Sequence, residues 1–528
     1  MAVAAGSTAL IFVVIFPLVL ATANHDVSRA TKNPHMLPGS SVIVHLFEWK
    51  FQDIAKECEG FLGPMGYGGV QVSPVTEHGI IRDGLRVRPW YERYQPVSYK
   101  IDTRIGNEDQ FKNMVRRCNQ AGVRIYVDVI LNHMTSNLKI QHGTAGSVFN
   151  YGERRYDGIP YNRSDFHNNA SCHSKSGGID DFNDASQVRN CELLGLLDLD
   201  QSREHVRERV LSFLNRLISY GVSGFRVDAA RHMSPQDLSV IYGRLQNLST
   251  EFFPPHSRPF IYQEVIDMGH GGPITKWDYN SIGRVTEFLY GAKLTEVLLR
   301  KNGQMLKYLD SFGESWGMLP SGDAVAFIDN HDNQRGHEAD AQVLSFFSPR
   351  LYKMATAFML AWPYGVARVM SSYFWHRNLV NGKDLNYWIG PPMDGEENIK
   401  SVITYPNNTC GNGWICEHRW RQIYNMVKFR NVSALEPVSH WWDNGYQAIA
   451  FGRRSRAYIV INHEDFVISR IFDTGMPSGT YCDVISGSKS GRTCTGRQVL
   501  VDSHGHADIT VDNKWEDPMI AIHVEAKL

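Results

Sequence analysis

The sequence of 528 residues has almost no net charge, because 54 Lys and Arg residues are balanced by 55 Asp and Glu residues. Proteins that bind nucleic acid usually carry a surplus of basic residues, so this composition gives no support to a nucleic acid partner. The sequence has no Cys-x-x-Cys motif, which argues against structural zinc, and it has no low-complexity tract. Its 43% hydrophobic and 21% charged residues are instead typical of a folded globular protein.

One strongly apolar run stands near the N-terminus, LIFVVIFPLVLATA at residues 10–23. Small and neutral residues precede it, and it ends in a small-x-small pattern that is typical of a signal peptidase site. The alternative is a membrane anchor, but the strongly apolar part is short and Pro17 interrupts it. We therefore interpret residues 1–23 as a signal peptide and expect a secreted, extracellular protein with no membrane association after cleavage.

The cysteine content agrees with export, because the chain has eight cysteines and an even number favours disulfides. Two close pairs indicate local bridges, Cys410 with Cys416 and Cys482 with Cys494. The sequence alone does not fix the other pairing, for which Cys58 with Cys118 and Cys172 with Cys191 is the simplest arrangement. Five Asn-x-Ser/Thr sites permit glycosylation of an exported chain: Asn162, Asn169, Asn247, Asn407 and Asn431.

Eight short apolar runs recur along the chain, several of them apolar at nearly every position, as in strands that are buried on both faces of a parallel sheet. Helix-like segments separate many of them, at residues 108–121, 205–220 and 235–248. Alternating strands and helices in this number predict an α/β fold, a (β/α)8 TIM barrel. The runs are 42–47, 68–74, 122–131, 224–229, 259–265, 283–288, 324–330 and 365–372.

Two segments depart from this alternation. Residues 133–197 are rich in Gly, Asn, Ser, His and Asp, and a connection of that length inside a compact domain indicates an inserted subdomain. Residues 437–528 contain short alternating runs, which predict a separate C-terminal antiparallel β-domain. The barrel is then built from residues 24–132 and 198–436.

Polar and charged side chains recur late in the apolar runs, where a barrel of this kind has its active site. A single Asp or His at a strand end is usually a cap or a turn residue, but that interpretation does not explain a whole set at equivalent ends. The set comprises Asp128, Asn132, His133, Arg226, Asp228, Glu264, Asn330, His331, Asp332 and Arg368.

Three carboxylates in this set, Asp228, Glu264 and Asp332, indicate chemistry on a glycosidic bond. That reaction needs an acid for the leaving oxygen and a second carboxylate that attacks or stabilises the cationic sugar. A third carboxylate can hold the hydroxyls of the distorted ring, and the histidines can add hydrogen bonds that strengthen in the transition state.

The motifs DVILNH, GFRVDAARH, IYQEV and FIDNHDNQRG resemble the four signature regions of the α-amylase family of retaining glycoside hydrolases. The resemblance is closest to secreted, chloride-dependent animal members and covers nearly the whole mature chain. It implies endo-hydrolysis of the α-1,4-glucosidic bonds of starch, glycogen and malto-oligosaccharides, with retention through a covalent glycosyl-enzyme intermediate. It also implies a digestive, extracellular enzyme, and no signal in the sequence points to anything but a monomer.

The resemblance assigns roles to individual residues. Asp228 becomes the nucleophile, Glu264 the acid and then the base, and Asp332 the residue that stabilises the transition state. The positions that the resemblance assigns to substrate binding are Trp90, Tyr91, Tyr94, Gln95, His133, Arg231, His331 and His337.

The resemblance also implies structural calcium. Its ligands would be the side chains of Asn132 and Asp198 and the backbone carbonyls of Arg189 and His232, all of them the oxygen ligands that a hard cation takes. Such an ion would tie the inserted subdomain to the barrel. The alternative is a subdomain that only the bridge between Cys172 and Cys191 holds.

An activating chloride is implied by Arg226, Asn330 and Arg368, which occupy the positions of the anion ligands in chloride-dependent members. Two buried guanidinium groups would favour the ionised form of Glu264 and weaken it as an acid, and an anion between them would offset that effect. The alternative is that both arginines pair with carboxylates.

Three positions depart from the family pattern. Arg231 stands where many animal members have Lys, Tyr91 replaces the second Trp of an aromatic pair, and EADAQVL follows His337 where vertebrate members have a glycine-rich loop. These departures leave open a diverged amylase-related protein or a maltase-like glucosidase. A non-catalytic barrel homologue is a third alternative, although the three intact carboxylates argue against it.

Overall fold

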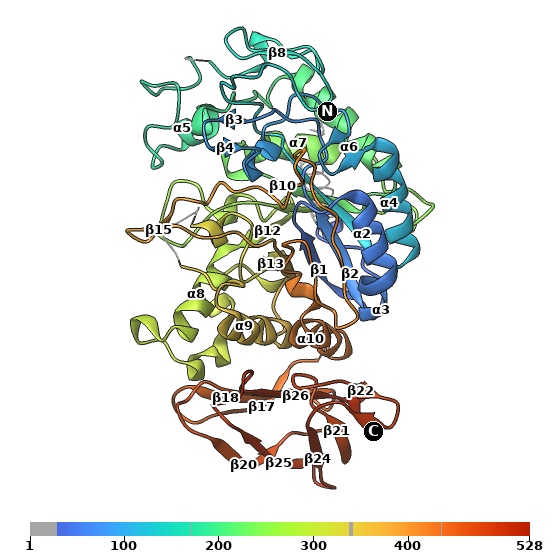
Figure 1. Ribbon diagram of the computed structural model, residues 1–528. Helices are drawn as coiled ribbons and strands as arrows, with labels where there is room; N and C mark the ends of the chain where they lie inside the picture. The colour runs from blue at the N-terminus through green and yellow to red at the C-terminus, as the bar shows by residue number, and fades with distance from the viewer. Residues whose placement is uncertain (1–28, 169, 337–341, 435) are drawn as a thin grey trace, which may run out of the picture.

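The computed structural model describes residues 29–168, 170–336, 342–434 and 436–528. The predicted signal peptide, the sequon residue Asn169 and His337 lie outside these described residues. The centre of the molecule is a closed barrel of parallel strands in the order β1-β14-β13-β12-β11-β10-β7-β2 (Figure 1). Each of the eight strands overlaps one predicted run, so the predicted barrel is confirmed. The strands are β1 Ser41–Leu46, β2 Tyr67–Val72, β7 Arg124–Val129, β10 Gly224–Val227, β11 Phe260–Gln263, β12 Arg284–Glu287, β13 Ala324–Ala326 and β14 Val366–Ser371.

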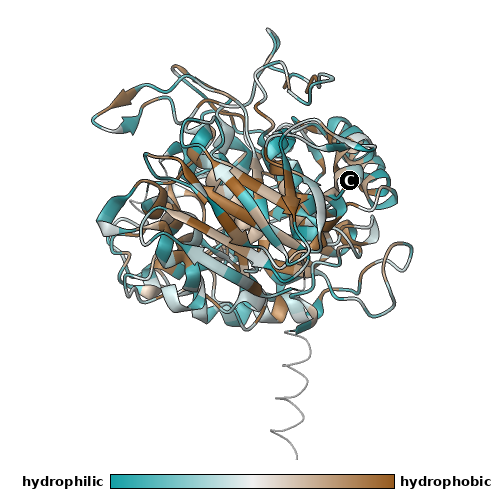
Figure 2. Ribbon diagram, turned by 90° about the horizontal axis from the view of Figure 1, so that it is seen from below, coloured by the Kyte–Doolittle hydropathy of each residue, from teal (hydrophilic) through white to brown (hydrophobic). Residues whose placement is uncertain are grey.

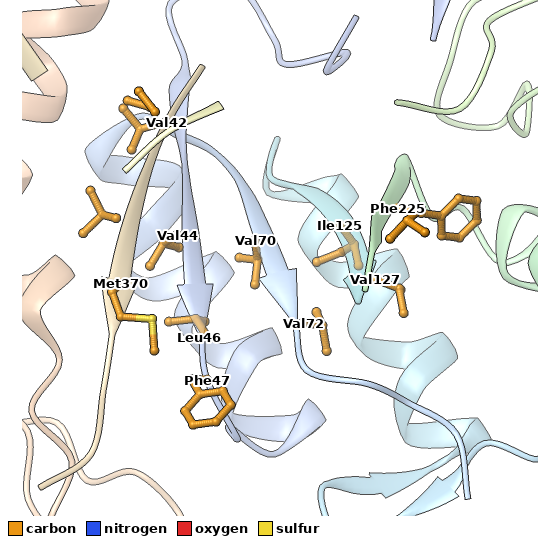
Figure 3. Packing of buried hydrophobic residues seen from close by; sticks show 14 of the residues in the cluster. Val42, Val44, Leu46, Phe47, Val70, Val72, Ile125, Val127, Phe225 and Met370 are labelled. Atoms are coloured by element: carbon orange, nitrogen blue, oxygen red, sulfur yellow. The ribbon is translucent and has the colours of Figure 1, made fainter. Parts of the chain in front are cut away.

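Successive side chains of a barrel strand point alternately outward, toward the helices, and inward, into the barrel. Both sets of side chains are therefore buried. Outward-facing residues such as Val44, Val70 and Ile125 join a large hydrophobic cluster with the surrounding helices (Figure 3). A second, smaller cluster inside the barrel includes Ile43 and Tyr126. The inward positions next to this cluster carry the polar residues of the strand ends.

Helices cover the outside of the barrel (Figure 1). Those predicted at residues 108–121, 205–220 and 235–248 correspond to α4, α6 and α7. The α4 helix begins with a capping box: the Asn107 side chain accepts a hydrogen bond from the Gln110 amide, and the Gln110 side chain accepts one from the Asn107 amide. The helices are α2 Phe51–Glu57, α3 Gly63–Met65, α4 Glu108–Gln120, α5 Ala185–Asn190, α6 Glu204–Ser219, α7 Pro235–Arg244, α8 Phe288–Leu298, α9 Pro349–Ala361 and α10 Arg421–Val432.

The long segment after β7 contains little regular structure, namely the hairpin of β8 (Phe149–Asn150) and β9 (Arg155–Tyr156), the helix α5 and short 3-10 turns. An antiparallel bridge between His133 and Asp198 joins the two ends of this segment. Other short hairpins project from the barrel loops: β3 Arg82–Asp83 with β4 Arg86–Val87, β5 Asp102–Thr103 with β6 Gly106–Asn107, and β15 Leu379–Val380 with β16 Lys383–Asp384.

An all-β unit follows the barrel and has its own hydrophobic core. Its main sheet is antiparallel in the order β17-β18-β19-β26. Figure 2 views the molecule from below, and there the hydrophobic residues are concentrated on strands in the middle of the molecule. The predicted boundaries near residues 132, 197 and 436 remain our division of the chain. The strands are β17 Val438–Asp443, β18 Ala448–Arg453, β19 Ala457–Asn462, β20 Ile468–Asp473, β21 Gly479–Cys482, β22 Lys489–Ser490, β23 Thr493–Cys494, β24 Gln498–Val501, β25 His506–Val511 and β26 Met519–His523.

Four disulfides cross-link the chain, and they use all eight cysteines: Cys58–Cys118, Cys172–Cys191, Cys410–Cys416 and Cys482–Cys494. The first joins the segment after α2 to α4 on the outside of the barrel, and the second closes the segment that contains α5. In the described part of the chain, no helix combines the length and the apolar character that a bilayer-spanning segment requires.

The close approach of α8 to the barrel depends on a glycine. A Cβ atom at Gly291 would lie 2.2 Å from the carbonyl oxygen of Ile328, which follows β13. Gly291→Ala should therefore destabilise the protein by about 1–3 kcal/mol, because backbone has to move. Gly243→Ala in α7 is the control, since its Cβ meets nothing within 4 Å and an Ala favours the helix. Thermal unfolding should show a lower Tm for the first variant alone, and equal Tm values would contradict this packing.

Candidate active site

One buried arginine connects the acidic residues at the carboxyl ends of β7, β10 and β11. Arg226, on β10, donates from Nη1 to Asp128 Oδ1 at 2.7 Å and to Asp228 Oδ1 at 2.5 Å. Its Nη2 donates to Glu264 Oε1. The parallel register places Arg226 beside Asp128, and both point into the barrel. A single guanidinium group therefore holds three carboxyl groups together.

The turn after β10 contributes a second link between the acidic residues. Ala229 follows Asp228 with a φ of 49°, the left-handed conformation that a residue with a side chain rarely adopts. In this conformation the Ala229 amide donates to Glu264 Oε2 at 2.8 Å. Glu264 thus accepts hydrogen bonds on both oxygens, and its position is fixed relative to Asp228.

The charges of this cluster do not balance. Burial raises the pKa of Asp228 well above its ordinary value, Arg226 opposes the rise, and the nearby carboxylates of Glu264, Asp128 and Asp332 add to it. Burial likewise raises the pKa of Asp128. With one guanidinium among three carboxyl groups, full ionisation would leave uncompensated negative charge in a buried site. The carboxyl groups therefore influence one another's ionisation, and one of them can keep a proton beside an ionised neighbour.

Two histidines lie near this cluster in their neutral form. His331 Nε2 is 3.0 Å from Asp332 Oδ2, and its ring stacks on Tyr94 with centroids 5.0 Å apart. His133 Nε2 lies 3.0 Å from the Tyr94 carbonyl oxygen. Burial lowers the pKa of His331 well below its ordinary value and that of His133 to about 4. Neutral imidazoles can exchange hydrogen bonds with a polyhydroxylated ligand without adding charge.

The segment after β2 forms the 3-10 helix η2 (Trp90–Tyr94) at the same end of the barrel. Tyr94 donates its hydroxyl to Asp128 Oδ2 at 3.0 Å, which joins this segment to the acidic cluster. Trp90 is buried edge-on to His331, and Tyr91 is half-buried against Trp90. Of the predicted substrate-binding residues in this segment, Trp90 and Tyr94 contact His331, and Tyr91 contacts Trp90.

Two other predicted substrate residues are occupied by contacts with the protein. Gln95 accepts hydrogen bonds at Oε1 from the amide and hydroxyl of Ser136, so its carbonyl oxygen fastens the loop after β7. Arg231 donates from Nη1 to the Ile266 carbonyl oxygen at 2.7 Å, in the loop that follows Glu264.

The four residues predicted to bind calcium fall into two pairs, and the two residues of each pair belong to adjoining segments. Asn132 is fully buried, and its Oδ1 has no hydrogen-bond partner among the described residues. Asp198 forms a β-bridge with His133, the residue after Asn132. Burial raises the pKa of the Asp198 carboxyl group to about 7, although His167 Nδ1 contacts it at 2.6 Å and opposes the rise. An orphaned amide oxygen and a carboxylate that burial destabilises are donors that suit a hard cation.

The second pair is Arg189, in α5, and His232. His232 Nδ1 lies 2.9 Å from the carbonyl oxygen of Val188, the residue before Arg189, so the two predicted carbonyl donors belong to adjoining segments. No group of three or more His, Cys, Asp or Glu residues in the described part of the chain is arranged to hold a metal ion.

The three residues predicted to bind chloride have different contacts. Arg226 pairs with carboxylates, as the alternative interpretation required, but Arg368 does not among the described residues: its Nη1 donates to Gln71 Oε1 at 3.0 Å and its guanidinium lies 4.6 Å from the Phe327 ring centre. Asn330 Oδ1 accepts from the amides of Asp332 and Asn333 and so shapes the turn at Asp332. Burial and the neighbouring Arg226 lower the pKa of Arg368, while Tyr262, Asp128 and Glu264 oppose this shift.

The chain matches two family models, "Alpha amylase, catalytic domain" over residues 61–241 and "Alpha amylase, C-terminal all-beta domain" over residues 440–525. The alpha-amylase of Oryzias latipes is 52% identical over 94% of this chain and 97% of that protein. The pancreatic alpha-amylase of Homo sapiens is 53% identical with the same coverage.

Solved structures agree with these relatives. A mutant of alpha-amylase I from Eisenia fetida in complex with maltohexaose superposes with a TM-score of 0.88 at 50% identity, covering 93% of this chain and 98% of that chain. The alpha-amylase of Geobacillus thermoleovorans superposes with a TM-score of 0.59 at 14% identity, a similarity of fold.

Sequence reasoning missed a pair of buried carboxyl groups beneath the site. Asp329 directly precedes Asn330, and its buried carboxyl group lies beside the Tyr352 hydroxyl. Glu417 accepts from the Ser372 amide at 2.7 Å. Burial raises the pKa of Glu417 to about 7, and burial together with Glu417 raises the pKa of Asp329 well above its ordinary value. No local motif identifies Glu417, because only the fold brings it close to Asp329 and to Ser372 after β14.

The raised pKa of Glu417 predicts a pH dependence of stability. The folded protein binds this proton more tightly than the unfolded chain, so stability should fall as the pH rises from the ordinary carboxyl pKa of about 4.3 to about 7. Glu417→Gln keeps an acceptor for Ser372 and cannot ionise. Its Tm should fall less than that of the wild type between about pH 5.5 and about pH 8, by roughly 3 °C.

The exposed Glu251 provides the control, since Glu251→Gln should keep the wild-type slope of Tm against pH. Parallel slopes for Glu417→Gln and the wild type would show that the Glu417 proton is not linked to folding.

Proposed function

The chain belongs to the α-amylase family, and from this premise we propose that it hydrolyses α-1,4-glucosidic bonds of starch, glycogen and malto-oligosaccharides as a secreted, monomeric endo-acting enzyme. The observation that carries this proposal is the buried Arg226, which binds both Asp228 and Glu264 at the ends of β10 and β11. Retaining glycosidases need two carboxyl groups about 5 Å apart, and a shared guanidinium group supports a short separation.

In the first step, Glu264 protonates the glycosidic oxygen while Asp228 attacks the anomeric carbon. The glycosidic C–O bond breaks, the aglycone leaves with the proton, and an ester forms between Asp228 and the sugar. Glu264 is then ionised. In the second step it removes a proton from water, the oxygen of that water attacks the anomeric carbon, and Asp228 is released. Two displacements at one carbon retain its configuration.

The other site residues bind and distort the sugar. Asp332, beside the neutral His331, would accept hydrogen bonds from ring hydroxyls and stabilise the cationic transition state. His133 would bind the same sugar unit. Trp90, Tyr91 and Tyr94 offer aromatic surfaces for neighbouring glucose units. His337 and the polar atoms of Gln95 and Arg231 that do not bond to Ser136 or Ile266 complete the proposed substrate contacts.

Calcium and chloride are part of the proposal. Asn132 and Asp198, with the carbonyl groups of Arg189 and His232, would hold a structural calcium, for which the orphaned Asn132 oxygen is the supporting observation. When bound, this ion would tie the inserted segment to the barrel. Arg226, Asn330 and Arg368 would hold chloride, which supplies a negative charge that offsets two guanidinium groups near Glu264.

The alternatives differ in products and in catalysis. A maltase-like enzyme would remove glucose from chain ends, whereas an endo-acting enzyme cuts internal bonds and releases longer oligosaccharides. A non-catalytic homologue would have no reason to keep Asp228, Glu264 and Asp332 together, since buried acidic residues destabilise a fold that does not use them.

Reducing-sugar release from soluble starch tests the function and the anion together. Wild-type enzyme dialysed free of halide should have weak activity that rises when chloride is added, and Glu264→Gln should have lost at least about 1000-fold in kcat because it cannot donate a proton. Wild-type activity that chloride does not change would remove the anion site and keep the enzyme. No activity under either condition would contradict the proposed function.

Calcium removal should lower stability. Excess EDTA should lower the Tm by roughly 5 °C or more, because an ion that binds only the folded state stabilises it by mass action. Asp198→Asn should weaken this response by removing a charged ligand, while Asp157→Asn, at an exposed position in the same segment, should respond like the wild type. A Tm that EDTA leaves unchanged in the wild type would favour the alternative in which the Cys172–Cys191 disulfide holds this segment without an ion.

A further inference from the structure

Arg335 is a buried arginine in the motif FIDNHDNQRG for which the proposed mechanism has no role. It ends the 3-10 helix η11 (Asn333–Arg335) and is only 4% exposed. No ion pair with a carboxylate is found for it among the described residues. Aromatic rings surround its guanidinium instead, with ring centres at these distances from Cζ: Trp375 4.2 Å, Tyr373 5.1 Å, Phe47 5.4 Å and Trp90 5.5 Å.

These rings come from different parts of the barrel. Phe47 directly follows β1 (Figure 3), Trp90 lies in η2 after β2, and Tyr373 and Trp375 follow β14. Each ring face attracts a cation, and the attraction is stronger where water is excluded. Arg335 therefore joins the loops of three strands to the loop after β13.

One hydrogen bond connects this cage to the site. Arg335 Nη1 donates to the carbonyl oxygen of His331 at 2.5 Å. His331 in turn contacts Asp332 through Nε2, stacks on Tyr94 and meets Trp90 edge-on at 5.4 Å. A shift of the His331 backbone would thus move both Asp332 and the surface against which the sugar lies.

We propose that Arg335 is a positioning residue for glycoside cleavage, which from its aromatic cage fixes the backbone of His331 and thereby the place of Asp332. This inference rests on the proposed function and deepens it. Arginine suits the position because a planar guanidinium can stack on a ring and still donate in its plane, whereas a lysine ammonium cannot do both. Arg335 acts through His331 and does not touch the substrate.

The charge of Arg335 gives a readout that a purely structural residue would lack. Burial lowers the pKa of His331, the neighbouring His45 adds to this effect, and so do the cations Arg226, Arg335 and Arg368, whereas the carboxylate of Asp332 faces it with opposite charge. Removal of one of these cations makes protonation of His331 easier. The acid limb of kcat/KM should then move to higher pH.

The experiment compares Arg335→Met and Arg335→Lys with the wild type on a malto-oligosaccharide. Arg335→Met should lose roughly 10–100-fold in kcat with little change in KM, because a small displacement of a catalytic group is costly. Its acid limb should move to higher pH. Arg335→Lys keeps the charge, so it should recover part of kcat and keep the wild-type acid limb.

Arg377→Met is the matched control, since Arg377 also stacks on a ring, at 3.8 Å from the Phe347 centre, but at an exposed position. Its kcat and pH profile should equal those of the wild type. Wild-type kcat in folded Arg335→Met, or a loss of kcat without a moved acid limb or recovery by Lys, would overturn the inference.

A second variant covers the case in which Arg335→Met does not fold. Trp375→Leu removes the nearest ring and keeps the charge, so it should lower kcat without moving the acid limb, and unchanged kcat in both Trp375→Leu and Arg335→Lys would also overturn the inference. A wild-type enzyme that does not cleave the substrate would instead refute the proposed function, a separate result.

Discussion

The buried guanidinium group of Arg226 is the interaction on which the rest of the site depends. It contacts Asp128, Asp228 and Glu264, which come from three neighbouring strands. Without a cation, three carboxyl groups in a water-poor space would all bind protons or repel one another. With one cation they remain close while the cluster still lacks full neutralisation. Because the carboxyl groups outnumber the guanidinium group that they share, one of them can keep a proton and act as an acid while another is ionised and acts as a nucleophile.

The interior of the barrel extends this interaction. Gln71 on β2 accepts a hydrogen bond from Arg368 on β14 and from the Tyr262 hydroxyl on β11. Tyr94 reaches Asp128 from the loop after β2. Inward positions of separate strands therefore form one polar layer above the apolar interior cluster. Since buried polar groups are costly when unpaired, this layer fixes the strand ends as firmly as the hydrophobic contacts fix the strands.

The surrounding loops are positioned in a different way. The turn at Ala229 directs a backbone amide to Glu264, and the cage of rings around Arg335 holds the segment that contains His331 and Asp332. In both places a backbone group rather than a second side chain transmits position. The His133–Asp198 bridge joins the two ends of the long segment after β7, and the contact of His232 with Val188 joins this segment to the loop after β10. Contacts between backbone groups and side chains thus position these loops at the carboxyl ends of the strands.

The sequence by itself determined the eight strands, the main helices and the set of polar residues at the strand ends, because a parallel barrel imposes apolar runs of regular spacing and sends their ends to one face. It could not determine which partner each charge has. Arg226 pairs with three carboxylates while Arg368 meets an amide and a ring, although both are arginines on barrel strands. Nor could it reveal that Glu417 lies near Asp329, or that aromatic residues from three loops enclose Arg335. Those contacts join residues far apart in the chain, and only the closure of the barrel sets their distances and removes the water between them.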